Sequence, residues 1–330
     1  MKTIKINTEK PYGVTIARGY KDFCLDKKFS KTLIVTDENV YRLYLDEVKS
    51  LFDGEVYTVA IKSGETSKSL EGYFCVLNVL FEKGFSRNDL LVCLGGGVVG
   101  DVGGFAASTY LRGISYIEMP TTLLSMIDSS VGGKTGINYQ GVKNSIGSFY
   151  TPRYVYANLD TLNTLPKKEF ENGKGELTKY SFLTKTVSSD DSIENAVYNS
   201  VKFKAEITEK DEKDRGVRAL LNLGHTVGHA VEELSNYTLS HGLCVFKGLY
   251  SAVKISEKLY GFTEEKSKRL INMLNAQNAD YTLPYKKEEI LNAIRRDKKA
   301  DGDKIRFVTV FDVGDCRIEE LSFDEMEKLL

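Results

Sequence analysis

Between Lys31 and Ile117, short runs rich in β-branched and apolar residues alternate with longer segments of helical periodicity. The strand-like runs are 31–37, 55–61 and 89–97, and the helix-like segments 39–52 and 67–84 separate them. Strands joined by helices of this length are normally parallel and covered by helices on both faces. Such sheets bind ligands at the carboxyl ends of their strands. The alternation therefore predicts an α/β domain of Rossmann-like type, with its binding site in the loops that follow the strands.

Beyond about residue 160 the β-rich alternation fades and helical spacing takes over. Helical patterns cover 192–207, 225–236, 246–261 and 287–299, and a short β pair is expected within 304–321. At 330 residues the chain exceeds the roughly 250–300 residues at which a single core stops growing. We therefore expect two domains, an α/β domain over residues 1–160 and a mainly α-helical domain over residues 161–330.

The charge balance and the cysteines exclude several classes of protein. Lys and Arg number 45 and Asp and Glu number 46, so the chain has no basic excess to indicate a nucleic-acid partner. The 5 cysteines are scattered and form no CxxC pair, which is typical of a reducing compartment. No signal peptide is recognisable, and no uncharged apolar run reaches the roughly 18 residues of a membrane span. We expect a cytoplasmic protein without a membrane partner.

Three consecutive glycines, Gly95, Gly96 and Gly97, follow an apolar strand and open a helical segment of small residues. Glycine lets the backbone approach a ligand closely, and free amides at a helix N-terminus favour phosphate, so the pyrophosphate of a dinucleotide would fit. A tight turn with close packing and no ligand is the alternative, since the pattern is not the usual GxGxxG. Polar residues in two other loops expected at the same edge are Asp37, Asn39, Glu65 and Lys68. Taken separately, these are ordinary helix caps.

The 3 histidines of the chain, His225, His229 and His241, lie close together in the sequence. Neutral imidazole is the commonest metal ligand, and residues four apart share a helix face, so spacing alone favours His225 and His229 as a metal-binding pair. Carboxylates that could complete such a site are Glu176, Glu232 and Glu233. The alternative is that the histidines are packing or surface residues of a helix.

Basic and amide side chains lie among glycines and hydroxyl residues in the stretch 110–144, which we expect to form ligand-binding loops. They are Arg112, Lys134, Lys143 and Asn144, and similar residues near the histidines are Lys204, Arg218 and Asn222. Arginine grips phosphate or carboxylate with two parallel hydrogen bonds, and lysine neutralises charge. Any one of them alone is more often a solvated surface charge. Their coincidence with the glycine turn and the histidines indicates a site for a small phosphorylated anion.

These same residues carry a resemblance to the 3-dehydroquinate synthase family of sugar-phosphate cyclases. The segments that resemble the family are 95–113, 120–138, 143–150, 159–166, 175–180 and 218–232, with weaker similarity over nearly the whole chain. The resemblance implies an N-terminal Rossmann-like domain that binds NAD, a mainly α-helical C-terminal domain that binds metal and substrate, and a homodimer. It also implies a divalent metal, most often zinc, with cobalt as an alternative.

The implied reaction converts 3-deoxy-D-arabino-heptulosonate 7-phosphate into 3-dehydroquinate and phosphate, a step of aromatic amino-acid biosynthesis. It proceeds by transient oxidation with NAD, elimination of phosphate, return of the hydride and internal aldol closure. NAD is therefore recycled within each turnover.

Matched onto this sequence, the family's metal ligands are Glu176, His225 and His241, which replaces the pair favoured by spacing alone. Residues that match the substrate pocket are Arg112, Asp128, Lys134, Asn144, Lys179, Lys204, Arg218, Asn222, His229, and one of Lys298 and Lys299. The resemblance places Arg112 in the partner subunit's site. Residues that match the NAD site are Asp37, Asn39, Glu65, Lys68, Gly96, Gly97, Val98, Asp101, Thr121, Thr122, Asp128, Ser129, Lys143, Thr161, Thr164 and Leu165.

Two departures and three alternatives remain open at this point. Leu243 stands where the family usually has an acid just after its second metal histidine, and the segment between Glu176 and Lys204 is shorter than expected. The alternatives are a cyclase for another sugar phosphate, a metal-dependent polyol dehydrogenase that releases NADH, and a silent NAD-binding protein.

Overall fold

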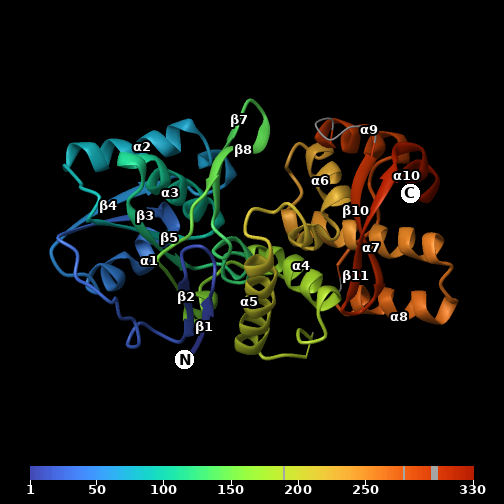
Figure 1. Cartoon of the computed structure of the whole chain (residues 1–330), viewed down its shortest axis with the longest axis horizontal. Helices are drawn as coiled ribbons and strands as arrows, with labels where there is room; N and C mark the ends of the chain where they lie inside the picture. Colours follow the sequence, from blue (N-terminus) through green and yellow to red (C-terminus); the bar gives the residue numbers. More distant parts are fainter. Residues whose placement is uncertain (189, 278, 299–303) are drawn as a thin grey trace. The chain divides into compact units, whose positions relative to one another are not determined.

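The structure is a computed structural model that describes residues 1–188, 190–277, 279–298 and 304–330. The chain forms two compact units (Figure 1). The first consists of Met1–Pro166 and Lys204–Lys213, and the second of Lys167–Phe203 and Asp214–Leu330. The functional division at residue 160 stays a prediction.

The first unit contains the predicted alternation of strands and helices, which is confirmed. Its elements are β3 (Lys31–Asp37), α1 (Glu38–Lys49), β4 (Glu55–Ile61), α2 (Leu70–Glu82), β5 (Leu90–Gly95), α3 (Gly97–Thr109) and β6 (Ser115–Pro120). The main sheet also contains β1 (Lys2–Ile6), β2 (Tyr12–Ala17) and β9 (Tyr154–Asn158). Within residues 1–188, which are all described, its order is β1-β2-β9-β6-β5-β3-β4. From β2 to β4 in this order every adjacent pair of strands is parallel, whereas β1 is antiparallel to β2.

Both faces of this sheet are covered, as expected for a parallel sheet. Leu33 and Val35 of β3 pack in one core with α2 and α3, whereas Ile34 packs in the other core with α1. Figure 1 shows α2 and α3 on one face of the strands and α1 on the other. Because successive side chains of a strand point to opposite faces, a strand buried on both sides is apolar throughout.

Several strands of the first unit were not expected from the sequence. They are β1 (Lys2–Ile6) and β2 (Tyr12–Ala17), which pair antiparallel, the sheet strand β9 (Tyr154–Asn158), and the separate hairpin of β7 (Lys134–Tyr139) and β8 (Val142–Phe149). The expectation that 110–144 consists of loops is therefore wrong over β6, β7 and the start of β8. The hairpin is rich in glycine and polar residues, so its pattern resembles that of a loop.

The strand order contains a topological switch point, at which two successive connections run to opposite sides of the same strand. From β3 the chain adds β4 on one side, and then β5 on the other side of β3. Ligands bind outside the carboxyl ends of the strands at such a switch point. The glycine turn after β5 and the loop after β3 both lie there.

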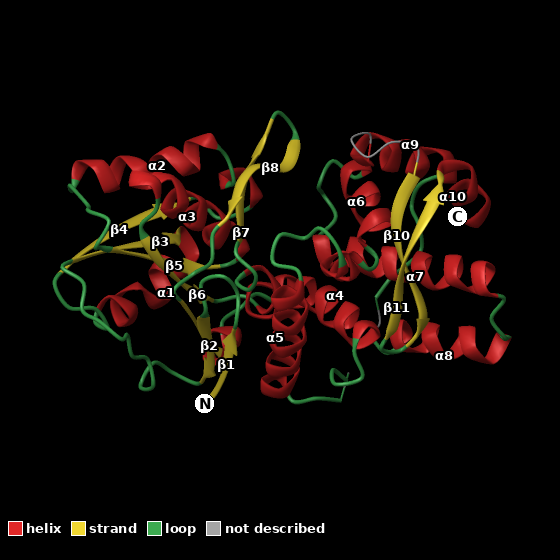
Figure 2. Cartoon of the chain, in the orientation of Figure 1, coloured by secondary structure: helices red, strands yellow, loops and turns green. Residues whose placement is uncertain are grey.

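The second unit is mainly helical, as predicted, and Figure 2 shows how helices dominate it. Its helices include α4 (Lys167–Leu183), α6 (His225–Leu234), α7 (His241–Tyr260), α8 (Glu264–Asn275), α9 (Lys287–Lys298) and α10 (Phe323–Leu329). Helix α5 (Ile193–Lys210) spans the boundary between the units at Lys204. The predicted late β pair is confirmed as the antiparallel strands β10 (Lys304–Asp312) and β11 (Asp315–Ser322). Among the described residues, no helix is long and apolar enough to cross a membrane.

Candidate active site

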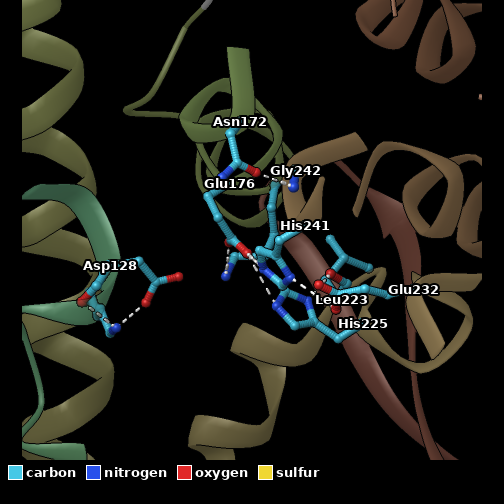
Figure 3. A network of polar contacts seen from close by, with 10 residues as sticks. Asp128, Asn172, Glu176, Leu223, His225, Glu232, His241 and Gly242 are labelled. Carbon is cyan, nitrogen blue, oxygen red and sulfur yellow. Dashed lines mark hydrogen bonds and ion pairs between the residues drawn. The ribbon is translucent and has the colours of Figure 1, made fainter. Parts of the chain in front are cut away.

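A carboxylate and two imidazoles meet in the second unit, one from each of helices α4, α6 and α7. Glu176 Oε1 lies 2.8 Å from His241 Nε2 and 3.2 Å from His225 Nε2. His225 Nδ1 lies 3.1 Å from the carbonyl oxygen of Leu223, which turns Nε2 toward the carboxylate. Figure 3 shows both rings directed at Glu176. These residues form what we call the Glu176 cluster: Glu176, His225 and His241.

Glycines let the three helices approach closely enough to form this cluster. A Cβ added to Gly175 of α4 would collide with the backbone of Gly242 in α7, and one added to Gly228 of α6 would lie 2.9 Å from the Cys244 carbonyl oxygen. The side chain of Asn172 then fixes the start of α7, because its Oδ1 accepts a hydrogen bond of 2.6 Å from the amide of Gly242. Each glycine is next to, or near, a member of the cluster in the sequence.

The environment of the cluster changes the pKa values of Glu176 and His241. Burial opposes ionisation of Glu176, but the Lys179 ammonium, 2.5 Å from Oε2, and the nearby His225 hold the pKa of this carboxyl well below its usual range. Burial likewise disfavours a charged His241, yet hydrogen bonding to Glu176 and Glu232 raises its pKa to about 9. Glu176 therefore stays ionised, and a metal that binds through Nε2 of His241 must displace the proton that these hydrogen bonds favour.

The donor set fits a divalent metal. One ligand atom from each of Glu176, His225 and His241 lies within 4.8 Å of the others, and a second group of His229, Glu232 and His241 meets the same criterion. Two histidines and one glutamate with an open fourth position are typical of catalytic zinc. Among the described residues, neither group contains both His225 and His229, whose ring centroids lie 5.1 Å apart, and the choice between the two ligand sets stays a prediction.

Other predicted substrate residues of the second unit occupy different environments. Lys179 and Arg218 are buried, and Arg218 lies in the 3-10 turn η5 (Val217–Asn222). Asn222 and His229 are exposed within their unit and come one turn before and one turn after His225. The side chain of Lys298 and the whole of Lys299 lie outside the described residues.

The predicted cofactor residues of the first unit gather at the carboxyl edge of the sheet. Helix α3 begins at Gly97, and its N-cap Gly96 offers no side chain to its first amides. A Cβ on Gly97 would lie 3.0 Å from Ser129 Oγ, and one on Gly96 would lie 3.1 Å from Thr122 Cγ2. The turn is thus tightly enclosed by the neighbouring loop, and its backbone fits the phosphate-binding role that glycines predict.

Two buried ion pairs lie in the same unit. Lys68 Nζ is 2.5 Å from Asp101 Oδ2, and burial raises the pKa of Asp101 although Lys68 opposes the rise. Lys204 Nζ donates to the Asp128 carboxylate and, at 2.7 Å, to the Asp128 backbone carbonyl. Asp128 belongs to the short π-helical turn η3 (Ser125–Ser129).

The remaining cofactor candidates have visible structural roles. Asp37 caps α1, since its Oδ1 accepts from the amides of Asn39 and Val40 at 2.9 and 3.1 Å. Glu65 Oε1 accepts from the side chain of Asn138 at 2.8 Å. The others line the ends of strands β5, β6 and β9: Val98, Thr121, Thr161, Thr164 and Leu165. Of these, Thr121 and Thr161 are buried and joined by a hydrogen bond of 3.3 Å.

The hairpin and the turn before β6 hold the remaining basic candidates. Lys134 begins β7, and Lys143 and Asn144 lie near the hairpin turn in β8. Arg112 and Asn144 adopt left-handed backbone conformations, with φ of 65° and 53°. Non-glycine residues in this region are uncommon and mark positions with a special geometric demand.

Comparison with known proteins gives a consistent result. The family model described as 3-dehydroquinate synthase N-terminal matches residues 58–172, and the one described as 3-dehydroquinate synthase C-terminal matches 173–300. The chain is 42% identical to a 3-dehydroquinate synthase of Thermococcus kodakarensis, over 91% of this chain and 88% of that protein. It is 38% identical to that of Clostridium acetobutylicum, over 100% and 99%.

A solved structure of 2-deoxy-scyllo-inosose synthase has the same fold. It superposes with a TM-score of 0.88 at 21% identity, covering 99% of each chain, and it is complexed with carbaglucose-6-phosphate, NAD⁺ and Co²⁺.

Proposed function

Because the chain belongs to the 3-dehydroquinate synthase family, we propose that it converts 3-deoxy-D-arabino-heptulosonate 7-phosphate into 3-dehydroquinate and phosphate. The observation that carries this proposal is the Glu176 cluster, a buried carboxylate and two imidazoles with Lys179 at 2.5 Å from the carboxylate. When bound, NAD supplies a reversible hydride acceptor and a divalent metal, zinc or cobalt, supplies a Lewis acid.

The residues proposed to hold these groups belong to different units. Glu176, His225 and His241 hold the metal in the second unit. In the first unit the backbone at Gly96 and Gly97 receives the pyrophosphate of NAD, supported by the two loops that follow β3 and β6. The start of α3 supports this assignment, because no side chain caps its first amides.

The chain's own side chains bind and orient the substrate. Lys134, Lys204 and Arg218 neutralise its carboxylate and phosphate, and burial of Lys204 and Arg218 strengthens each contact because little water competes. Lys179, Asn144, Asn222 and His229 position the hydroxyl groups. Asp128 holds Lys204 in place. Much of the catalysis is therefore positioning.

Two further assignments complete the proposal. The protein acts as a homodimer in which Arg112 serves the partner subunit's site, and it is cytoplasmic. The left-handed backbone of Arg112 supports an unusual placement of this side chain.

The test is to incubate the purified protein with the heptulosonate phosphate and a trace of NAD, and to follow phosphate and NADH together. We expect release of one phosphate per substrate without accumulation of NADH, because the hydride returns to the same molecule. Glu176→Gln serves as the control that lacks a metal ligand. Stoichiometric NADH would instead identify a polyol dehydrogenase, and turnover of another sugar phosphate alone would identify a different cyclase.

A further inference from the structure

The two histidines of the Glu176 cluster are oriented by different kinds of acceptor. Each directs Nε2 toward Glu176 Oε1, at 3.2 Å for His225 and 2.8 Å for His241. His225 Nδ1 faces the neutral carbonyl of Leu223 at 3.1 Å, whereas His241 Nδ1 faces the carboxylate oxygen of Glu232 at 3.5 Å. Only His241 therefore pairs its second nitrogen with an acid among the contacts that the structure describes.

The position of Glu232 in the fold is energetically unfavourable for an ionised carboxylate. Its side chain is only 6% exposed, and it lies in the last turn of α6 (His225–Leu234), where the negative end of the helix dipole disfavours an anion. A buried acid at this position requires partners that compensate its charge, and His241 is one of them. Its neighbour Glu233 takes the ordinary alternative, since it points outward and binds Arg296 at 2.7 Å.

We propose that Glu232 is a positioning residue that orients His241 for metal binding. By accepting the Nδ1 hydrogen it keeps the Nε2 lone pair of His241 directed at the cluster and makes that nitrogen a stronger donor. Leu243, two residues after His241, carries no acid, and the carboxylate that faces His241 Nδ1 comes from α6.

The second three-residue group, His229, Glu232 and His241, offers a competing role for the same acid, that of a direct ligand. The position of His241 argues against it. Its Nε2 already faces Glu176 at 2.8 Å, while only Nδ1 faces Glu232. A metal bound through Nε2 leaves Nδ1 to carry a hydrogen, which a carboxylate accepts. Glu232 thus acts through His241.

The inference rests on the proposed metal site and is tested by metal binding rather than by activity. Apo protein is titrated with Zn²⁺ against a chromophoric chelator, and the Co²⁺ form is examined by visible absorption. We expect affinity to fall about tenfold for Glu232→Gln, which keeps an acceptor without charge, and about a hundredfold for Glu232→Ala. The matched control, Glu233→Gln on the same helix, should bind metal like the unaltered chain.

Further measurements separate this role from its rivals. Chemical unfolding of the apo forms should show that Glu232→Gln stays folded and loses only the stability that its contact with His241 contributes, while Glu233→Gln is unchanged. Unchanged affinity in both Glu232 variants would overturn the inference. So would an equal loss in Glu233→Gln, or a loss in His229→Ala that matches Glu232→Ala, the pattern of direct ligation. Failure of the unaltered chain to bind Zn²⁺ or Co²⁺ would refute the proposed metal site itself.

Discussion

The two units hold their candidate sites in different ways. In the first, the proposed NAD site is formed mostly by backbone at strand ends, where glycines leave space and helix α3 presents uncapped amides. In the second, the Glu176 cluster is formed by buried charged side chains from α4, α6 and α7. Ligand binding at the first site should therefore suffer most when a substitution adds a side chain. Binding at the second site should suffer most when a substitution removes a charged group.

The largest expected effect follows from removing the charge at the centre of the cluster. Glu176→Gln takes away a proposed metal ligand and leaves Lys179 buried without its carboxylate partner. Breaking a buried ion pair in this way costs about 3–5 kcal/mol, so the apo protein should unfold at clearly lower denaturant concentration and purify without metal. Elemental analysis and urea unfolding measure both effects.

A matched change on the same helix serves as the control for that prediction. Glu171 pairs with Lys174 at 3.0 Å at the surface, and such exposed pairs contribute only about 0–1 kcal/mol. Glu171→Gln should therefore change neither metal content nor stability measurably. If both variants behaved alike, the cluster would have no special energetic role.

The second prediction separates the histidines. His225→Ala and His241→Ala should lose metal, whereas His229→Ala should keep it and lose turnover by about a hundredfold, within the range for a group that contacts the reacting substrate. Metal content and the rate of phosphate release distinguish the two classes. Loss of metal in the His225 and His229 variants, with retention in His241→Ala, would restore the pair that spacing favours.

The third prediction concerns the anion grip of the second unit. Arg218 is buried, and lysine in its place presents a single ammonium instead of a planar fork of donors. Arg218→Lys should lower kcat/KM for the sugar phosphate by about one to two decades, equivalent to roughly 1.5–3 kcal/mol, with NAD affinity unchanged. Weakened NAD binding with normal substrate turnover would contradict the proposed division between the units.

The sequence predicts the main-sheet strands of the first unit better than it predicts the β7–β8 hairpin. Local periodicity finds β3 and β5 because strands buried on both faces are apolar in their centres, and it finds the edge strand β4 from its β-branched and aromatic residues. It does not find the β7–β8 hairpin, whose strands are polar, contain glycines and show no regular alternation of buried and exposed positions in β7. These strands are defined by pairing within the hairpin and by Ile137, which packs in the core with α2 and α3.

The proposed metal site shows more clearly that spacing along the sequence cannot identify ligands that come from different helices. Periodicity compares residues on one helix and so selects His225 and His229, whereas the structure joins residues of three helices through glycine contacts. Family resemblance supplies the set of Glu176, His225 and His241. Neither source distinguishes the adjacent acids Glu232 and Glu233, because the rotation of α6 against α7 decides which one faces inward.

The smallest expected effect tests the first unit by addition of a single methyl group. Gly97→Ala places a Cβ 3.0 Å from Ser129 Oγ, so either the serine or the backbone must shift at the turn where the pyrophosphate of NAD is proposed to lie. We expect NAD affinity to fall about tenfold, or ~1.4 kcal/mol, with metal content unchanged.

Gly13→Ala is the matched control, because its Cβ meets Tyr154 at an ordinary 3.7 Å. Fluorescence titration with NADH measures both variants. Equal affinity in the two would show that the turn is a packing feature, and a loss of metal in Gly97→Ala would show that the two sites are not independent.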